Sequence, residues 1–239
     1  MRGAATARKK RTAGRPKPDG RLTIPGVYHR LFAANGRQHW WPGDGAFEIM
    51  VGAVLTQNTA WTNVEKAIKR LKEARSLSVA ALGRMTHRRL ALLIKSAGYF
   101  NVKARRLKNF ISFLQGCHAG SLNKMFRQPT PRLRQELLAV NGVGPETADS
   151  ILLYAGGKPS FVIDAYTKRI LSRHGVMAYE NSYDDFQALF MKHLPRSASF
   201  YNQYHAMFVN VGKHFCRKRP LCASCPLNGW RNVPPLKAA

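Results

Sequence analysis

One acidic residue, Asp164, stands where a short apolar run meets a helical pattern. Residues 161–163 are Phe, Val and Ile, and a helical spacing of apolar residues follows over 165–173. This position is typical of a helix N-cap, a role that aspartate favours. A carboxylate at a helix N-terminus also stays ionised, because the helix dipole stabilises negative charge there. Asp164 can therefore cap its helix and still carry a negative charge that is available for chemistry.

Upstream of Asp164, two helical patterns meet at the hairpin Gly142-Val143-Gly144-Pro145. Both glycines permit positive φ in a tight connection, and Pro145 suits the first helical position, where no N–H is needed. Backbone N–H groups gather at such a helix start and suit a phosphate oxygen without reading a base. The predicted nucleic-acid contacts are therefore Gly142, Val143, Gly144 and Thr147; an ordinary helical hairpin is the alternative.

Three tryptophans stand beside loops or turns. Trp40 and Trp41 are adjacent just before Pro42, and both cannot easily face one core, so we expect at least one to line a cleft. Trp61 follows the polar turn that contains Gln57. An indole face attracts a cationic ligand more strongly than a neutral one. Core packing is the alternative for each tryptophan.

The charge of the chain points to a polyanionic partner. It carries 39 Lys and Arg against 12 Asp and Glu, a net charge of +27. Residues 1–20 hold seven basic residues and one acidic residue, so about +21 belongs to the rest. Nucleic acid is the leading candidate, with an acidic protein or an anionic membrane surface as alternatives. No run approaches the about 18 apolar residues of a membrane span. A secretory signal is not expected, whereas an Arg-rich transit peptide stays open for a eukaryotic source.

Three of the four cysteines form the cluster Cys216-x5-Cys222-x2-Cys225, and Cys117 stands apart. In a chain without an export signal, this spacing favours metal ligation over disulfides. Zinc with His214 as a further ligand, an iron–sulfur cluster and no metal at all stay open.

The remaining pattern predicts an all-α fold of about ten helices. Residues 1–20 read as a disordered basic tail. No stretch alternates convincingly enough for a strand. The predicted helices are 22–32, 46–55, 60–72, 77–83, 87–96, 102–115, 131–140, 146–155, 165–173, 183–193 and 199–214.

The hairpin, the Gly/Pro-rich loop 156–159 and Asp164 together resemble, in this order, the helix-hairpin-helix DNA glycosylases related to endonuclease III. The segments 40–42, 55–59 and 98–104 are similar to the 3-methyladenine DNA glycosylase branch of that superfamily. The resemblance implies two helical lobes with a cleft between them. One lobe is the central bundle 46–158, which ends in the helix-hairpin-helix. The other combines 21–45 with 159–230 and includes the C-terminal cysteine loop.

The resemblance also implies roles for individual residues. Asp164 stabilises charge on the deoxyribose and helps water attack C1′, while a flipped base stacks on aromatic rings, expected here to be those of Trp40, Trp41, Trp61 and Tyr166. Gln57 fills the gap that the flipped base leaves; a helix C-cap is its alternative. The cysteine loop resembles a 4Fe–4S cluster loop in which the fourth cysteine is missing, because 228–231 is Asn-Gly-Trp-Arg.

Glu146 departs from the pattern of the bifunctional members, which carry a lysine at this place. That amine forms a Schiff base with the sugar, which a carboxylate cannot do. Lys168 and Lys213 are the nearest substitutes, and each is expected to be a surface or phosphate-contacting charge.

The sequence thus predicts a monofunctional DNA glycosylase of base excision repair. It would hydrolyse the N-glycosidic bond of a flipped alkylated purine, 3-methyladenine above others. The alternatives are an endonuclease III-type glycosylase/lyase on damaged pyrimidines and a non-catalytic DNA-binding protein on the same scaffold. The expected state is a monomer on double-stranded DNA with a damaged base, away from membranes. It would lie at the nucleoid in the cytoplasm of a bacterium or archaeon, or in the nucleus or mitochondrion of a eukaryote.

Overall fold

The computed structural model describes residues 23–38 and 40–230, so the predicted tail 1–20 lies outside the described residues. No strand occurs in these two ranges, which confirms the all-α prediction. None of the helices in the described part of the chain has the length and apolar character needed to span a bilayer. The elements are α1 (Ile24–Asn35), α2 (Ala46–Leu55), α3 (Trp61–Glu73), α4 (Val79–Arg84), α5 (His87–Leu93), η1 (Lys95–Ala97), α6 (Phe100–His118), α7 (Leu122–Arg127), α8 (Thr130–Leu138), α9 (Pro145–Ser150), η2 (Ile151–Ala155), α10 (Ala165–Arg173), α11 (Tyr183–His193), α12 (Ala198–His214) and η3 (Cys222–Ser224).

Most helices lie where the apolar spacing predicts them, and α10 and α11 have the predicted bounds. The short helix α7 is absent from the prediction. Its six residues hold less than two turns of apolar pattern, and its start depends on Ser121, whose hydroxyl accepts a hydrogen bond from the Lys124 N–H at 3.3 Å. The predicted helix 146–155 begins as α9 and ends in the π-helical turn η2.

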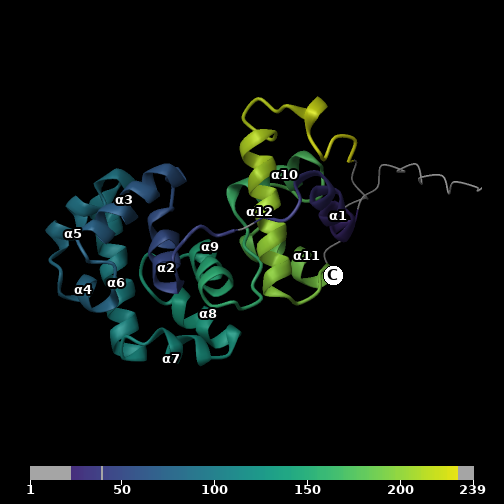
Figure 1. Cartoon of the computed structure of the whole chain (residues 1–239). Coiled ribbons are helices and arrows are strands. Elements are labelled where there is room, and N and C mark those ends of the chain that lie inside the picture. The colour runs from purple at the N-terminus through teal and green to yellow at the C-terminus, as the bar shows by residue number, and fades with distance from the viewer. Residues whose placement is uncertain (1–22, 39, 231–239) are drawn as a thin grey trace, which may run out of the picture.

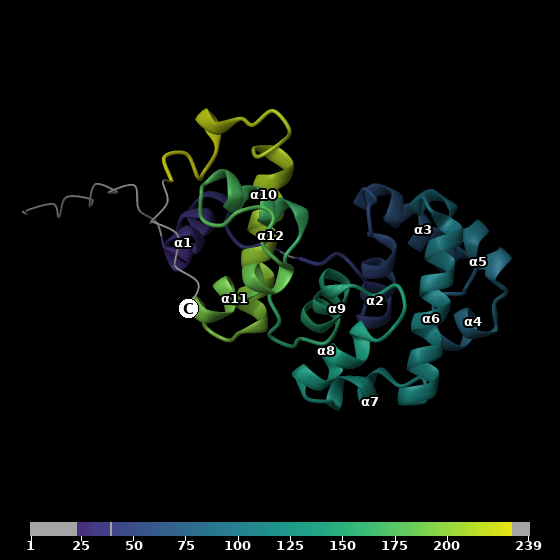
Figure 2. The ribbon, with the colours of Figure 1, turned by 180° about the vertical axis from the view of Figure 1, so that it is seen from behind.

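The buried apolar side chains form two separate clusters. One gathers α2 to α9, with Leu107 and Phe110 at full burial. The other joins α1 to α10, α11 and α12 around Phe161. Leu152 belongs to the first cluster and Leu153 to the second, so the helix α9–η2 lies between two lobes, as Figures 1 and 2 show from opposite sides. The residue limits of the predicted lobes stay predictions.

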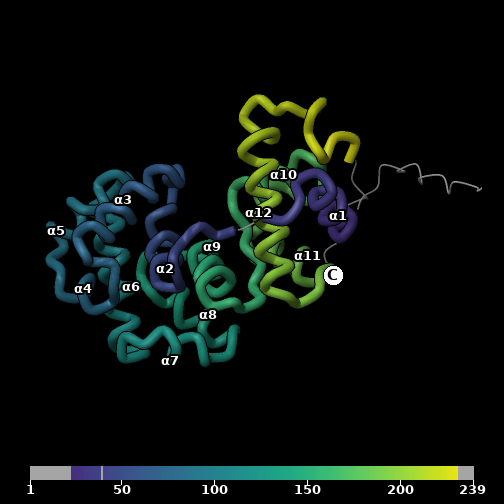
Figure 3. Tube along the Cα trace, in the orientation of Figure 1, coloured from purple at the N-terminus to yellow at the C-terminus, as the bar shows by residue number. Residues whose placement is uncertain are grey.

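The chain passes from one lobe to the other twice. The first crossing runs from α1 to α2, and the second runs from η2 to α10 (Figure 3). Trp40 and Trp41 lie on the first crossing, and Asp164 ends the second. The two connections therefore bring the predicted pocket and the predicted catalytic residue to the junction of the lobes.

Candidate active site

Asp164 is held at the start of α10 as the predicted N-cap. Its Oδ1 accepts a hydrogen bond from the Thr167 N–H at 2.7 Å, and the side chain is only 13% exposed. The preceding residues 161–163 are buried in the second lobe, which anchors the segment that ends in Asp164. The second carboxylate oxygen, Oδ2, lies 3.6 Å from Nε2 of His205 on α12. The carboxylate is thus fixed by backbone at one oxygen and faces a buried imidazole with the other.

Glu146 lies in the first turn of α9, and its charge and that of Asp164 act on each other. Glu146 is exposed at this end of the helix, yet neighbouring protein atoms desolvate its carboxyl group. This desolvation, followed by the negative charge of Asp164, raises the pKa of Glu146 to about 7. Glu146, which follows the hairpin, is therefore near enough to Asp164 for the two charges to interact.

The three predicted tryptophans form one aromatic cluster. The ring centroids of Trp41 and Trp61 are 5.1 Å apart, and the two planes are nearly perpendicular, at 86°. Trp40 lies 6.1 Å from Trp41. Trp41 packs with the second lobe and Trp61 with the first, so their contact crosses the junction. All three side chains are half-buried, which leaves part of each open to a ligand.

Tyr154 connects this cluster to Asp164, although the sequence analysis gave it no role. Its ring centroid lies 4.9 Å from that of Trp41, and its hydroxyl is 2.6 Å from Nδ1 of His205. Burial and the negative charge of Asp164 raise the pKa of Tyr154 well above its usual range. The indole nitrogens of Trp40 and Trp41 are buried, and within the described residues they have no hydrogen-bond partner of good geometry. The Trp40 side chain is nevertheless close enough to the Tyr154 hydroxyl to offset part of this rise in pKa.

Tyr166, the fourth predicted pocket residue, has different neighbours. Its ring packs over the backbone of Gly212, where an added Cβ would overlap it. The Arg169 guanidinium lies above the ring at 5.1 Å. Glycine at 212 thus allows α10 and α12 to approach, and the contacts of Tyr166 are those of helix packing. Its role in a base pocket stays a prediction.

The two candidate substitute lysines are placed differently. Lys168 donates to the carbonyl of Asn181 at 2.9 Å and lies over the rings of Tyr179 and Phe186. Its amine is therefore engaged in a structural contact. Lys213 lies over the Trp40 ring at 5.4 Å with its side chain exposed, so it is the candidate amine beside the aromatic cluster.

The hairpin has the predicted position and one unpredicted conformation. Gly142 has a φ of 95°, and an added Cβ would overlap the Arg106 side chain, so glycine is required twice over. Gly144 does not use the positive φ that glycine permits: its φ is −91°, because it serves as the extended N-cap residue of α9. The Val143 N–H donates to the Val140 carbonyl at 2.9 Å and closes the turn, so it is engaged within the hairpin.

Gln57 is tied to the hairpin. Its Nε2 donates to the Gly142 carbonyl at 3.0 Å and to Thr147 Oγ1 at 2.9 Å, while Arg106 donates to its Oε1. Thr147 is buried, so its hydroxyl holds Gln57 in place of an outside partner. The roles of both residues in DNA binding stay predictions, and entry of Gln57 into a duplex would require exchange of these bonds.

Lys103 supports the turn that contains Gln57, a role that the sequence pattern did not predict. It is buried, and its Nζ donates to the carbonyls of Leu55 and Ala97 at 2.8 and 2.7 Å. Burial, with a smaller contribution from the charge of Arg106, lowers the pKa of Lys103 to about 8. No local signal marks this lysine, because the start of α6 mixes apolar, polar and basic residues, and lysine is rarely buried without partners.

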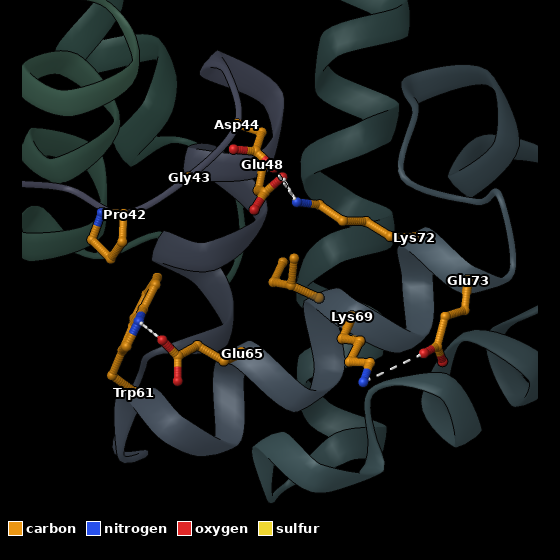
Figure 4. A pocket seen from close by; sticks show the side chains of 10 residues that line it. Pro42, Gly43, Asp44, Glu48, Trp61, Glu65, Lys69, Lys72 and Glu73 are labelled. Carbon is orange, nitrogen blue, oxygen red and sulfur yellow. Dashed lines mark hydrogen bonds and ion pairs between the residues drawn. The ribbon is translucent and has the colours of Figure 1, made fainter.

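A cavity of about 470 Å³ opens beside Trp61, between α3 and the start of α2 (Figure 4). Two of the acidic residues that line it, Asp44 and Glu48, form ion pairs with Lys72, both at 2.7 Å. The Trp61 indole N–H donates to Glu65 at 2.8 Å, which fixes the orientation of the ring. Asp164 does not line this cavity. The contacts around the cavity therefore serve the site by positioning Trp61.

Cys216, Cys222 and Cys225 line a second cavity, of about 180 Å³, at the C-terminal loop. The Arg173 guanidinium and the Leu227 N–H donate to two of the sulfurs, each at 3.4 Å. Within residues 23–38 and 40–230, no three His, Cys, Asp or Glu side chains are placed to hold a single metal ion. A zinc site with His214 and a loop without metal stay open alternatives. The 4Fe–4S cluster stays a prediction.

Comparison with known proteins identifies the family. A model described as "HhH-GPD superfamily base excision DNA repair protein" matches residues 51–196. A Methanocaldococcus jannaschii protein with a provisional name as a DNA repair glycosylase is 46% identical over 203 residues, which cover 84% of this chain and 92% of that protein. Endonuclease III of Thermotoga maritima is 29% identical over 180 residues, 75% of this chain and 79% of its own.

Solved structures agree with this match. The H. pylori 3-methyladenine DNA glycosylase bound to 1,N6-ethenoadenine has a TM-score of 0.71 and 26% identity, over 80% of this chain and 98% of that chain. An endonuclease III trapped as a covalent intermediate with DNA has a TM-score of 0.74 and 23% identity, over 86% and 95%, a likeness that shows the fold alone. The family model spans more than half of the chain, so the chain belongs to the HhH-GPD superfamily, as predicted.

Proposed function

We propose that this member of the HhH-GPD superfamily is a monofunctional DNA glycosylase that hydrolyses the N-glycosidic bond of an alkylated purine, 3-methyladenine above others. The observation that carries the proposal is a fixed, nearly buried carboxylate at the lobe junction, linked through His205 and Tyr154 to a cluster of tryptophans. This arrangement supplies a negative charge and an aromatic surface for one flipped nucleotide.

An alkylated purine needs little acid catalysis to leave the sugar. An N-alkylated purine is cationic, so when the C1′–N bond breaks, the base takes the electron pair and leaves neutral. The positive charge that develops on the deoxyribose is stabilised by the ionised Asp164. Water adds to C1′ and loses a proton, and the products are a free base and an abasic site.

The aromatic cluster favours a cationic base as the substrate. A cation over an indole face gains roughly 0.5–2 kcal/mol relative to a neutral ligand. Trp40, Trp41 and Trp61 are half-buried and lie within one continuous contact chain. The partner is duplex DNA that contains the damaged base, and the strongly basic composition favours its phosphate backbone.

Glu146 supports hydrolysis without strand cleavage. It lies at the start of α9 facing the charge of Asp164, where a carboxylate cannot form an imine. The amine of Lys168 is engaged with Asn181 and two aromatic rings. An endonuclease III-type lyase would therefore have to use Lys213, the amine beside Trp40.

Base release from methylated duplex DNA tests the proposal. Enzyme in excess over DNA is incubated, and free bases are identified by mass spectrometry. Wild type is expected to release 3-methyladenine, and Asp164→Asn to be slower by a factor on the order of 10² or more. Asp185→Asn, which removes a capping carboxylate at the start of α11, is the matched control and should retain wild-type rates. Equal rates for Asp164→Asn and wild type would refute the catalytic assignment.

A further inference from the structure

We infer that His205 is a positioning residue for Asp164 and that Tyr154 sets its tautomer. The inference rests on the proposed function, in which Asp164 provides the catalytic charge. The three side chains come from three different elements: Asp164 caps α10, His205 lies in α12 and Tyr154 in η2. Tyr154 packs in the cluster of the second lobe, so the three side chains meet on that lobe's side of the junction.

His205 is enclosed between the other two side chains. Its own side chain is 4% exposed. Nδ1 is 2.6 Å from the Tyr154 hydroxyl, and Nε2 is 3.6 Å from Asp164 Oδ2. Nε2 is buried and has no hydrogen-bond partner within the described residues, so Asp164 is the acceptor that it faces. Hydrogen bonds of catalytic groups are often long in the free enzyme and shorten when substrate binds.

The protonation of His205 and Tyr154 favours one tautomer of the His205 imidazole. Burial lowers the pKa of His205, so the imidazole is neutral near pH 7 and carries one ring proton. Burial raises the pKa of Tyr154, so its hydroxyl keeps a proton to donate. If Tyr154 donates to Nδ1, the ring proton is on Nε2 and faces the carboxylate. The other tautomer would set the Nε2 lone pair against a carboxylate oxygen, which is repulsive.

This arrangement orients Asp164 without cancelling its charge. Oδ1 is held by the Thr167 N–H, and Oδ2 faces the neutral N–H of His205, so rotation of the carboxylate is restricted at both oxygens. A lysine or arginine in the same place would form an ion pair and weaken the field that Asp164 exerts on the sugar. Tyr154 also packs against Trp41, which links the positioning chain to the aromatic cluster.

Nitrogen NMR on protein labelled with ¹⁵N-histidine tests the tautomer directly, without DNA. Wild type is expected to show the Nε2–H form of His205, assigned by loss of its signals in His205→Gln. Tyr154→Phe keeps the ring and removes the donor to Nδ1, so the excess of the Nε2–H form should shrink to the part that the Asp164 carboxylate alone maintains. A wild-type His205 in the Nδ1–H form would overturn the inference, whatever the activity.

Single-turnover excision from methylated DNA tests the effect on Asp164. His205→Leu is expected to slow excision by about 10- to 100-fold, the range of a hydrogen bond to a charged group, with unchanged affinity for DNA. His205→Gln retains an N–H donor and should recover part of this loss, which a merely structural role would not explain. Wild-type rates for both a folded His205→Leu and Tyr154→Phe would overturn the inference. If wild type itself releases no base, the proposed function fails, while the tautomer result still stands or falls on its own.

Discussion

Arg134 holds a fully buried carboxylate, and its removal is expected to destabilise the fold strongly. Asp149 on α9 is 0% exposed, and Arg134 on α8 binds it through Nε at 3.0 Å and Nη2 at 3.1 Å. The Ser160 hydroxyl also donates to Asp149, and Arg134 reaches Asp184 on α11 at 3.0 Å. One guanidinium thus joins the hairpin to the second lobe, next to the segment that leads to Asp164.

The magnitude follows from burial. In Arg134→Ala the Asp149 charge keeps only neutral partners, the hydroxyls of Ser160 and Tyr183. Removal of one partner from a buried ion pair costs about 3–5 kcal/mol. One kcal/mol changes the Tm of a chain of this size by about 2–4 °C, so a fall of roughly 6–20 °C is expected. Scanning calorimetry and urea titration measure Tm and the free energy of unfolding.

The same helix provides a matched control. Arg132 pairs with Glu136 at 3.0 Å, yet its side chain is 68% exposed. Arg132→Ala is therefore expected to cost less than about 1 kcal/mol, because exposed pairs contribute little. Equal effects of the two arginine substitutions would refute the reasoning from burial. A stable, folded Arg134→Ala would further imply that Asp149 takes up a proton or becomes accessible to water.

Other predictions concern the site. In the folded chain Glu146 has a pKa of about 7, above its ordinary value of 4.5, so between these values the folded state holds a proton that the unfolded state has released. The contribution of Glu146 to stability should thus fall as pH rises from about 4.5 through 7, and Glu146→Gln should remove this part of the pH dependence of urea midpoints. Borohydride with abasic DNA should trap no efficient covalent adduct; if one forms and Lys213→Ala abolishes it, the lyase alternative gains. Affinity for duplex DNA should fall steeply with salt, with a slope of about −0.9 for each phosphate contact, and a flat slope would contradict phosphate binding.

Local patterns predicted much of the fold and part of the site. The bounds of α10 and α11 follow from apolar spacing and N-caps, both set by residues within a few positions. Asp164 was predicted as an N-cap for the same reason, and its hydrogen bond to Thr167 confirms this local role. The hairpin was predicted because Gly142 and Pro145 signal the turn and the helix start.

Local sequence patterns could not predict the contacts between residues far apart in the chain. Tyr154 and His205 are separated by 51 positions, and no local spacing brings them together. A single histidine on an apolar helix face reads equally well as packing. The hydrogen bonds of Gln57 to the hairpin join residues 85 and 90 positions apart. The φ of Gly144 could not be predicted, because a glycine hairpin does not reveal which glycine ends the turn and which caps the helix.

The position of Asp164 at the lobe junction explains why both lobes are needed for the proposed chemistry. The first lobe contributes Trp61, and the second contributes Trp41, so the aromatic surface exists only where they meet. His205 approaches Asp164 from α12 because α10 and α12 pack together, with Gly212 allowing the close approach of Tyr166. Tyr154 extends this chain toward Trp41 from η2, the helical turn that lies between the lobes. A change in how the lobes meet would therefore alter both the base surface and the orientation of the carboxylate, which makes the junction itself part of the active site.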